Sequence, residues 1–398
     1  MYLNIEKKIH QIEKILSEKT LLNDNFSLIG GRAGISLFHF YYSRIFQNEA
    51  SNNIAYKFIE NVFDSINNGF SMHTFAGGLA GIGWLIEFLE QNDFLETDTD
   101  EMLVELDDYL YKIMIEELKN NNYDYFHGAS GIALYFTKRK NSHKIKEYLN
   151  EYVNTLSEMA VIEREIIKWE SEIRITEENK EKEYNPSMSH GIASLISVLN
   201  KIYKLNINKV KSKKLIYGAM NYLFSIEQNT DKYYSYFPST INIKSDQKAT
   251  SRLAWCYGDL GISIALWNTS QILKNKVWEN KVLEILYYST TRKNLQKNRV
   301  IDAGLCHGSA GIAHIFNRMY INTKEQQFKD AADYWYAETL KMANHKNSLS
   351  GYKAWHTEKY GGWQEEFGFL EGIAGIGLTL MSAISDIEPT WDEILLIS

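Results

Sequence analysis

The chain has 398 residues and a formal net charge of −7 at pH 7. Its 44% hydrophobic and 23% charged residues are typical of a globular protein with a large buried core, and the acidic balance argues against a nucleic-acid-binding protein, which needs a basic face. The sequence lacks the run of about 18 apolar residues that a membrane-spanning helix needs. With only three prolines, which break helix interiors, the composition favours a mostly helical chain.

The first 19 residues predict an amphipathic helix. Their apolar side chains recur at helical spacing, at Ile5, Ile9, Ile12 and Leu16. The segment has neither the apolar centre nor the small-residue cleavage site of a secretory signal peptide. We therefore expect a cytoplasmic protein, in which the two cysteines of the chain serve as ligands or reactive thiols and form no disulfide.

A Gly-x-x-Gly-Ile motif recurs along the chain at intervals of 47 to 67 residues. Its fourth copy is altered, with Ser194 and Leu195 in place of Gly-Ile, which puts the start of the helix there in question. An apolar run typical of a buried helix follows each copy, and amphipathic stretches such as 101–118 and 330–342 lie between copies. The first glycines of the seven copies are Gly31, Gly78, Gly128, Gly191, Gly258, Gly308 and Gly372.

Each interval can hold one pair of helices, the usual unit of a helical repeat. The sequence therefore predicts an all-α protein, an α/α toroid of seven inner and seven outer helices in one domain over residues 1–398. Residues 161–185 depart from the pattern, because they are rich in charges and in β-branched patches. We expect an insertion there, before the fourth inner helix, as a short strand pair or a flap near the cavity mouth; plain solvated surface also explains its charges.

The residue before each first glycine would face a central cavity, because the turns of a toroid converge at one end. Titratable side chains occupy this position in the last five copies, and a purely structural repeat gives no reason for that bias. The five are His127, His190, Tyr257, His307 and Glu371. We assign no role to His127 and Glu371 and favour polar cavity lining for both.

The two cysteines occupy the same place in two adjacent copies. Cys256 and Cys306 each lie two residues before a first glycine, and His307 follows the second cysteine directly. Two thiols and an imidazole predict a zinc site with one open position, since structural zinc sites normally have four protein ligands. The structural alternative is a pair of buried cysteines that bind nothing.

Three of the motifs resemble those of the lanthionine synthetase C family, and the resemblance extends from residue 30 to residue 375. They are Ser189-His190-Gly191, Trp255-Cys256-Tyr257-Gly258 and Cys306-His307-Gly308-Ser309-Ala310-Gly311. The resemblance implies an α/α barrel with one zinc ion bound by Cys256, Cys306 and His307. It also implies thioether formation, in which a peptide cysteine adds to dehydroalanine or dehydrobutyrine.

The same resemblance implies four catalytic residues. His190 corresponds to the family's catalytic histidine and would act as the acid, and Asp124 would orient it. Arg252 would stabilise the developing enolate oxygen, and Tyr257 would donate a hydrogen bond. Each also has a structural alternative. His190 could be a helix-start residue and Asp124 a helix cap, while Arg252 could form a surface ion pair and Tyr257 could be a packing residue.

The resemblance points to a stand-alone zinc-dependent lantibiotic cyclase, because the first repeat near residue 30 leaves no room for a fused dehydratase domain. Its partner would be a dehydrated precursor peptide, and the family context allows a membrane-associated complex with a dehydratase and an exporter. Two alternatives stay open: transfer of glutathione to dehydroamino acids, and a non-catalytic zinc-containing scaffold that binds peptides. Prenyl transfer is a more distant option, since no Lys/Arg cluster for a diphosphate lies near the motifs.

Overall fold

The computed structural model describes residues 1–19, 24–139, 142–174, 180–243 and 249–398. These residues form two compact units. Unit 1 comprises residues 1–72, 253–255 and 287–398, and unit 2 comprises residues 73–252 and 256–286. Among the helices described, none combines the length and the hydropathy needed to span a bilayer.

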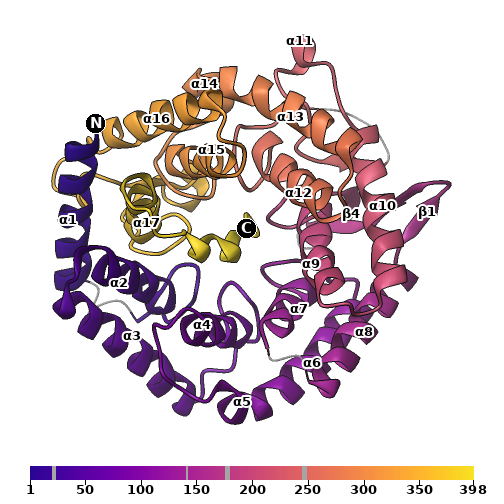
Figure 1. The fold of residues 1–398 in the computed structure, drawn as a ribbon, viewed down its shortest axis with the longest axis horizontal. Helices are drawn as coiled ribbons and strands as arrows, with labels where there is room; N and C mark the ends of the chain where they lie inside the picture. The colour runs from indigo at the N-terminus through magenta and orange to yellow at the C-terminus, as the bar shows by residue number, and fades with distance from the viewer. Residues whose placement is uncertain (20–23, 140–141, 175–179, 244–248) are drawn as a thin grey trace. The chain divides into compact units, whose positions relative to one another are not determined.

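Unit 1 consists of two layers of helices (Figure 1). In one layer α2, α17 and α15 pack side by side and are buried along most of their length, and in the other α3, α1 and α16 cover them. The apolar stripe of α1 is fully buried, at the four positions that its spacing predicts. The helices are α1 (Tyr2–Lys19), α2 (Arg32–Phe46), α3 (Glu49–Asn67), α14 (Leu295–Asn298), α15 (Ser309–Thr323), α16 (Gln326–Lys341) and α17 (Ile373–Ile384), with 3-10 turns η2 (Glu358–Tyr360) and η3 (Thr390–Leu395) and the antiparallel pair β6 (Ala354–Trp355) and β7 (Trp363–Gln364).

Unit 2 repeats the two-layer arrangement. Its buried layer runs α4, α7, α9, α12, each helix in contact with the next, while α6, α8 and α10 cover them from one side (Figure 1). The helices are α4 (Leu79–Gln91), α5 (Thr99–Met102), α6 (Val104–Lys119), α7 (Ala129–Lys138), α8 (His143–Glu158), α9 (Ile192–Lys204), α10 (Lys209–Ser225), α11 (Thr230–Tyr233), α12 (Asp259–Ile272) and α13 (Lys276–Thr291), the last of which ends in unit 1.

Short strands occupy the segment in which the sequence predicts an insertion. β1 (Val161–Glu163) and β2 (Ile166–Lys168) form an antiparallel hairpin, and β2 packs on α10. β4 (Lys180–Tyr184) pairs antiparallel with both β3 (Ser171–Arg174) and β5 (Ile241–Asn242). Part of the expected insertion, residues 175–179, lies outside the described residues.

All seven first glycines of the repeated motif are helix N-caps. They are Gly31 for α2, Gly78 for α4, Gly128 for α7, Gly191 for α9, Gly258 for α12, Gly308 for α15 and Gly372 for α17. The altered fourth copy follows the same rule, because α9 begins at Ile192 directly after its glycine. The Ser194 hydroxyl there donates to the carbonyl oxygen of Gly191 at 2.8 Å, so serine is compatible with this helix start.

The glycines of the third copy are required by close approach. A β-carbon at Gly128 would lie 2.4 Å from the Asn122 side-chain oxygen. At Gly131 it would lie 2.2 Å from the carbonyl oxygen of Tyr125 and 2.5 Å from the β-carbon of Phe75. No side chain fits at such distances, so the helix start packs against the preceding turn only with glycine.

We expect Gly131→Ala to lower the free energy of unfolding by about 1–3 kcal/mol, because the added methyl must displace backbone as well as a buried aromatic residue. Urea denaturation measures the change. The matched control is Ser194→Ala, at the equivalent position of α9, which loses only one hydrogen bond and should cost about 1 kcal/mol or less. Equal losses in the two variants would contradict the close-approach explanation.

Neighbouring turns are joined by paired backbone hydrogen bonds. In unit 2 the carbonyl oxygen of Cys256 accepts from the amides of Met188 and Ser189, at 3.1 and 3.5 Å. In unit 1 the carbonyl oxygen of Leu370 accepts hydrogen bonds from the amides of Leu305 and Cys306, at 2.9 and 3.1 Å. The carbonyl oxygen of Ile29 accepts hydrogen bonds from the amides of Phe369 and Leu370, at 2.9 and 3.0 Å. Each link holds the residues just before one helix against the turn of another.

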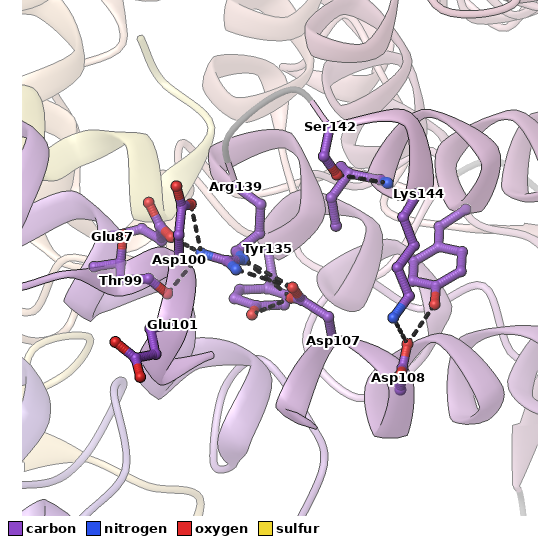
Figure 2. Close-up of polar contacts among 12 residues, drawn as sticks. Glu87, Thr99, Asp100, Glu101, Asp107, Asp108, Tyr135, Arg139, Ser142 and Lys144 are labelled. Atoms are coloured by element: carbon purple, nitrogen blue, oxygen red, sulfur yellow. Dashed lines mark hydrogen bonds and ion pairs between the residues drawn. The ribbon is translucent and has the colours of Figure 1, made fainter. Parts of the chain in front are cut away.

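A buried ion-pair network ties the end of α7 to its neighbours in unit 2 (Figure 2). The guanidinium of Arg139 contacts Glu87 of α4 and donates to both carboxylate oxygens of Asp107 of α6, from Nε at 3.0 and 3.1 Å and from Nη2 at 2.9 Å. It also donates to the carbonyl oxygen of Thr99 at 3.0 Å, and Tyr135 donates to Asp107 at 2.6 Å. Burial and the Asp107 charge together raise the pKa of Tyr135 well above its usual value, so this phenol stays a donor.

Candidate active site

His190 and Asp124 form a hydrogen-bonded pair in unit 2. Each lies in the turn before a buried helix, His190 before α9 and Asp124 before α7. His190 Nδ1 lies 2.6 Å from Asp124 Oδ2, and the other carboxylate oxygen accepts from the backbone N–H of His127 at 2.7 Å. Because the carboxylate holds Nδ1, the opposite ring nitrogen, Nε2, is left to exchange a proton with a ligand.

Each partner stabilises the charged form of the other. Burial alone would lower the pKa of His190, but the hydrogen bond and the negative charge of Asp124 outweigh it and raise the pKa above its usual value. Burial would likewise raise the pKa of Asp124, and the hydrogen bond and charge of His190 lower it instead. The histidine is therefore protonated over a wider pH range than a free imidazole.

His127, to which the sequence assigns no role, lies next to this pair. Its ring is 5.9 Å from the ring of His190, with 19° between the planes. Burial lowers the pKa of His127, and the nearby Asp124 opposes that change only in part. His127 thus favours its neutral form while His190 favours its charged form, and this difference suits His190 better as a proton donor.

Tyr257 lies on another side of His190, with 6.0 Å between the ring centroids. Burial raises the pKa of its phenol, and a hydrogen bond with the side chain of Asn185 lowers it in part. The pKa remains above the usual value, so Tyr257 is a hydrogen-bond donor at neutral pH.

Cys256 and Arg252 belong to the same unit as His190. Cys256 is buried, and its backbone carbonyl bonds the turn that carries His190. Arg252 is half-buried, and its backbone forms a parallel bridge with Gly258. The structure therefore brings His190, Asp124 and Tyr257 together and fixes the turn of Cys256 beside them.

Cys306 and His307 lie in unit 1, in the turn before α15, and both are half-buried. Two carboxylates flank the imidazole of His307: Asp302 Oδ2 lies 3.8 Å from Nε2, and Glu371 Oε1 lies 3.9 Å from Nδ1. Carboxylates beside an imidazole are typical partners of metal-binding histidines. Neither Cys306 nor Cys256 forms a disulfide.

A set of turn-forming residues that was not predicted from the sequence lies six places before the first glycine. In four copies an Asn or Asp side chain there accepts a hydrogen bond from the backbone N–H two residues further on. These pairs are Asn25 with Ser27 at 2.9 Å, Asn122 with Asp124 at 3.3 Å, Asn185 with Ser187 at 3.0 Å and Asp302 with Gly304 at 3.1 Å. Such turns fix the loops that carry Asp124, His190 and the Cys306–His307 pair, and the recurrence of Asn or Asp in the register is the signal that could have revealed them.

A cavity of about 490 Å³ opens beside the His190–Asp124 pair within unit 2. His190 and Asp124 line one part of it, and residues of the short strands line another. The remaining wall comes from the end of α6 and of α8. Its lining residues are Asn120, Asn121, Asn122, Tyr123, Asp124, Met159, Val161, Trp169, Glu170, Ser171, Lys182 and His190.

Glu183 of β4 is a buried carboxyl group that the sequence analysis did not single out. Burial raises its pKa to about 7, and a hydrogen bond with Thr240 opposes this only in part. The folded state therefore binds this proton more tightly than the unfolded chain, whose pKa is near the ordinary value. The resulting stability is fully present below about pH 4.5 and is lost as the pH rises to about 7.

We expect Glu183→Gln to remove this loss. Relative to the wild type, the variant should gain up to about 3 kcal/mol of unfolding free energy between pH 4.5 and pH 8, because glutamine never ionises. Urea unfolding at both pH values checks this, with the exposed Glu163→Gln as control. If the difference in unfolding free energy between Glu183→Gln and the wild type were the same at both pH values, Glu183 would not be a buried carboxyl group with a raised pKa.

Comparison with known proteins places the chain in a family. Residues 23–396 match the family model described as "Lanthionine synthetase C-like protein". The chain is 24% identical to "Nisin biosynthesis protein NisC" of Lactococcus lactis subsp. lactis, over 99% of this chain and 96% of that protein.

The structure is also similar to a solved structure of "Nisin cyclase", with a TM-score of 0.79 and 19% identity, over 99% of this chain and 98% of that one. This likeness shows the fold and confirms the predicted all-α, α/α-toroid class. Since the family model covers nearly the whole sequence, the chain belongs to the lanthionine synthetase C-like family.

Proposed function

We propose that the chain is a zinc-dependent cyclase that forms lanthionine and methyllanthionine rings in a dehydrated lantibiotic precursor peptide. Cysteine thiolates of the peptide would add to its dehydroalanine and dehydrobutyrine residues. The observation that carries the proposal is the His190–Asp124 pair, held in a turn that is bonded to the backbone of Cys256. The family and the names of the two nisin relatives support the same activity.

Cys256, Cys306 and His307 would hold the zinc ion. Two thiolates with one imidazole suit zinc. Three protein ligands are also the number that catalytic zinc sites use, and the carboxylates beside His307 support its role. When bound, zinc would supply the acidity that converts the substrate thiol to a thiolate at neutral pH.

The residues of the chain would complete the addition. As the substrate sulfur bonds to the β-carbon, the electrons of the double bond move to the carbonyl oxygen. Arg252 and Tyr257 would stabilise that oxygen by charge and by a hydrogen bond. His190 Nε2 would then give its proton to the α-carbon, and Asp124 would hold the imidazole in position throughout.

The test uses purified protein and a dehydrated peptide that contains cysteine. Cyclisation leaves the peptide mass unchanged and removes one thiol for each ring, so alkylation of the remaining thiols followed by mass spectrometry counts the rings. Added glutathione tests the alternative activity, because its transfer would raise the peptide mass. An unchanged number of thiols with zinc bound would overturn the cyclase proposal and leave the zinc-containing scaffold.

Metal removal gives a separate prediction. We expect Cys306→Ala to lower zinc affinity by at least about tenfold, since losing a residue that merely hydrogen-bonds a metal ligand already costs that much. The rate of thiol consumption should fall with the zinc content. Metal analysis of the dialysed protein measures it. Ser309→Ala, three residues away in the same helix start, should keep its zinc. Full zinc content in Cys306→Ala would remove this cysteine from the ligand set.

We further propose that residues 1–398 act as one domain, located in the cytoplasm and held near the membrane by a complex with a dehydratase and an exporter. A single cooperative unfolding transition supports the first statement, and two separate transitions contradict it. Co-purification with the dehydratase and exporter from a producing cell tests the second.

A further inference from the structure

The cavity of unit 2 places the catalytic pair and the strands of the insertion around one space. A ligand in this cavity would touch His190 and, at the same time, residues of β1, β3 and β4. Its volume of about 490 Å³ lies within the range of about 300–1,000 Å³ that ligand sites occupy. A short stretch of peptide fits such a volume.

The lining of the cavity suits a peptide backbone. Asn120 and Asn121 follow the end of α6 and are exposed, and each side-chain amide offers both a donor and an acceptor, as a peptide group does. Met159, Val161 and Trp169 supply an apolar part of the wall. This mixture of amides and apolar side chains can bind main chain and small side chains together.

The charges of the lining cancel in pairs. Asp124 is paired with His190, and Glu170 is paired with Lys182, whose Nζ lies 2.5 Å from Oε2 of the glutamate. The Glu170 and Lys182 side chains are 36% and 62% exposed, so this second pair lies on the solvent side of the cavity. A positively charged ligand residue would have to compete with Lys182 for Glu170, and a negatively charged one would have to compete with Glu170 for Lys182.

We infer that this cavity binds the residues of the substrate peptide that flank the dehydroamino acid, and that the Glu170–Lys182 pair selects for uncharged residues there. The inference rests on the proposed cyclase function and adds a specificity site to it. Removing either charge should leave the other unpaired and replace the preference for uncharged residues with a preference for residues of the opposite charge. An unpaired glutamate would favour a lysine in the peptide, and an unpaired lysine would favour a glutamate.

The test uses three dehydrated peptides that differ only at the residues flanking the dehydroamino acid, which are Gln, Lys or Glu. For the wild type we expect the highest kcat/KM with Gln. Lys182→Met should raise the ratio of kcat/KM for the Lys peptide over the Glu peptide by about two- to fivefold, the size expected of a half-exposed ion pair. Glu170→Gln should lower that ratio by a similar factor.

The matched control is an ion pair of the same length elsewhere in unit 2. Lys144 Nζ lies 2.5 Å from Asp108 Oδ1, and both side chains are about half exposed (Figure 2). Lys144→Met and Asp108→Asn should leave the ratio unchanged. The double variant Glu170→Lys with Lys182→Glu rebuilds the pair in reverse, and it should restore the preference for Gln.

Binding of the same peptides with alanine in place of the dehydroamino acid, measured by calorimetry, separates the two proposals. Charge-dependent binding without ring formation would overturn the cyclase function and keep the site. Ring formation with a ratio that neither variant changes, or that both change in the same direction, would overturn the site. A shift of equal size in Lys144→Met would overturn it as well, since the effect would then come from net charge.

Discussion

Replacing His190 with alanine is expected to slow ring formation by about 10²–10⁴-fold while the protein keeps its zinc and its fold. The loss follows from geometry: His190 Nδ1 is held by Asp124 at 2.6 Å, and Nε2 is the group that would deliver the proton. Asp124 also raises the pKa of His190, which favours the protonated imidazole that a proton donor needs. Alanine removes the proton donor and leaves the cysteines and His307 in place.

The measurement is the single-turnover rate of thiol loss, together with zinc content and far-UV circular dichroism. The control is His127→Ala, which removes a neighbouring imidazole. His127 bonds Asp124 through its backbone N–H, and this bond does not depend on the ring. We expect His127→Ala to lose much less activity than His190→Ala. If His190→Ala lost its metal, His190 would be a ligand and the assignment as acid would be wrong.

Replacing Arg139 with methionine is expected to cost about 3–5 kcal/mol of unfolding free energy, the largest stability effect that we expect of a single change. The guanidinium is the cation between the buried carboxylates of Glu87 and Asp107, and its own side chain is only 5% exposed (Figure 2). Without it, two negative charges stay buried without their main counter-charge. Urea denaturation at pH 7 gives the value.

Lys144→Met is the matched control, since it breaks an ion pair with the neighbouring residue Asp108 on the exposed side of α6. Exposed pairs contribute about 1 kcal/mol or less. A triple variant that also neutralises Glu87 and Asp107 as Gln and Asn should recover much of the loss, because no buried charge is then left alone. If Arg139→Met cost no more than Lys144→Met, the network would not hold α7 in the way described.

The sequence predicts most of the architecture because one local signal is repeated. The first glycine of every motif caps a helix, and each is followed by a buried apolar run, so position along the chain defines the buried layer. The stripe of α1 is predicted for the same reason, since helical spacing alone determines which side chains are buried. These features depend on neighbours in sequence and so can be deduced from it.

The site was predictable only in part. His190 and Asp124 are 66 residues apart, and spacing alone does not pair them; the family resemblance does. The Arg139 network, the Glu170–Lys182 pair and the burial of Glu183 depend on tertiary contacts between segments with no shared pattern. The strand pairs within the insertion also depend on tertiary contacts, because strands of three to five residues gain their stability from what they pack on, as β2 does on α10.

The backbone links between neighbouring turns make this protein a promising scaffold for enzyme engineering. Backbone carbonyl and N–H groups are common to all residues except proline, which lacks the N–H, so the turns of Cys256, Leu370 and Ile29 can stay joined with other side chains in place. Gly30 stands in the register that holds His190 and His307 in later copies, and a β-carbon there would meet side chains alone, the amide of Asn25 at 3.2 Å and the hydroxyl of Ser27 at 3.6 Å. A designer could therefore add a new acid, base or ligand at that turn and leave the native fold to hold it.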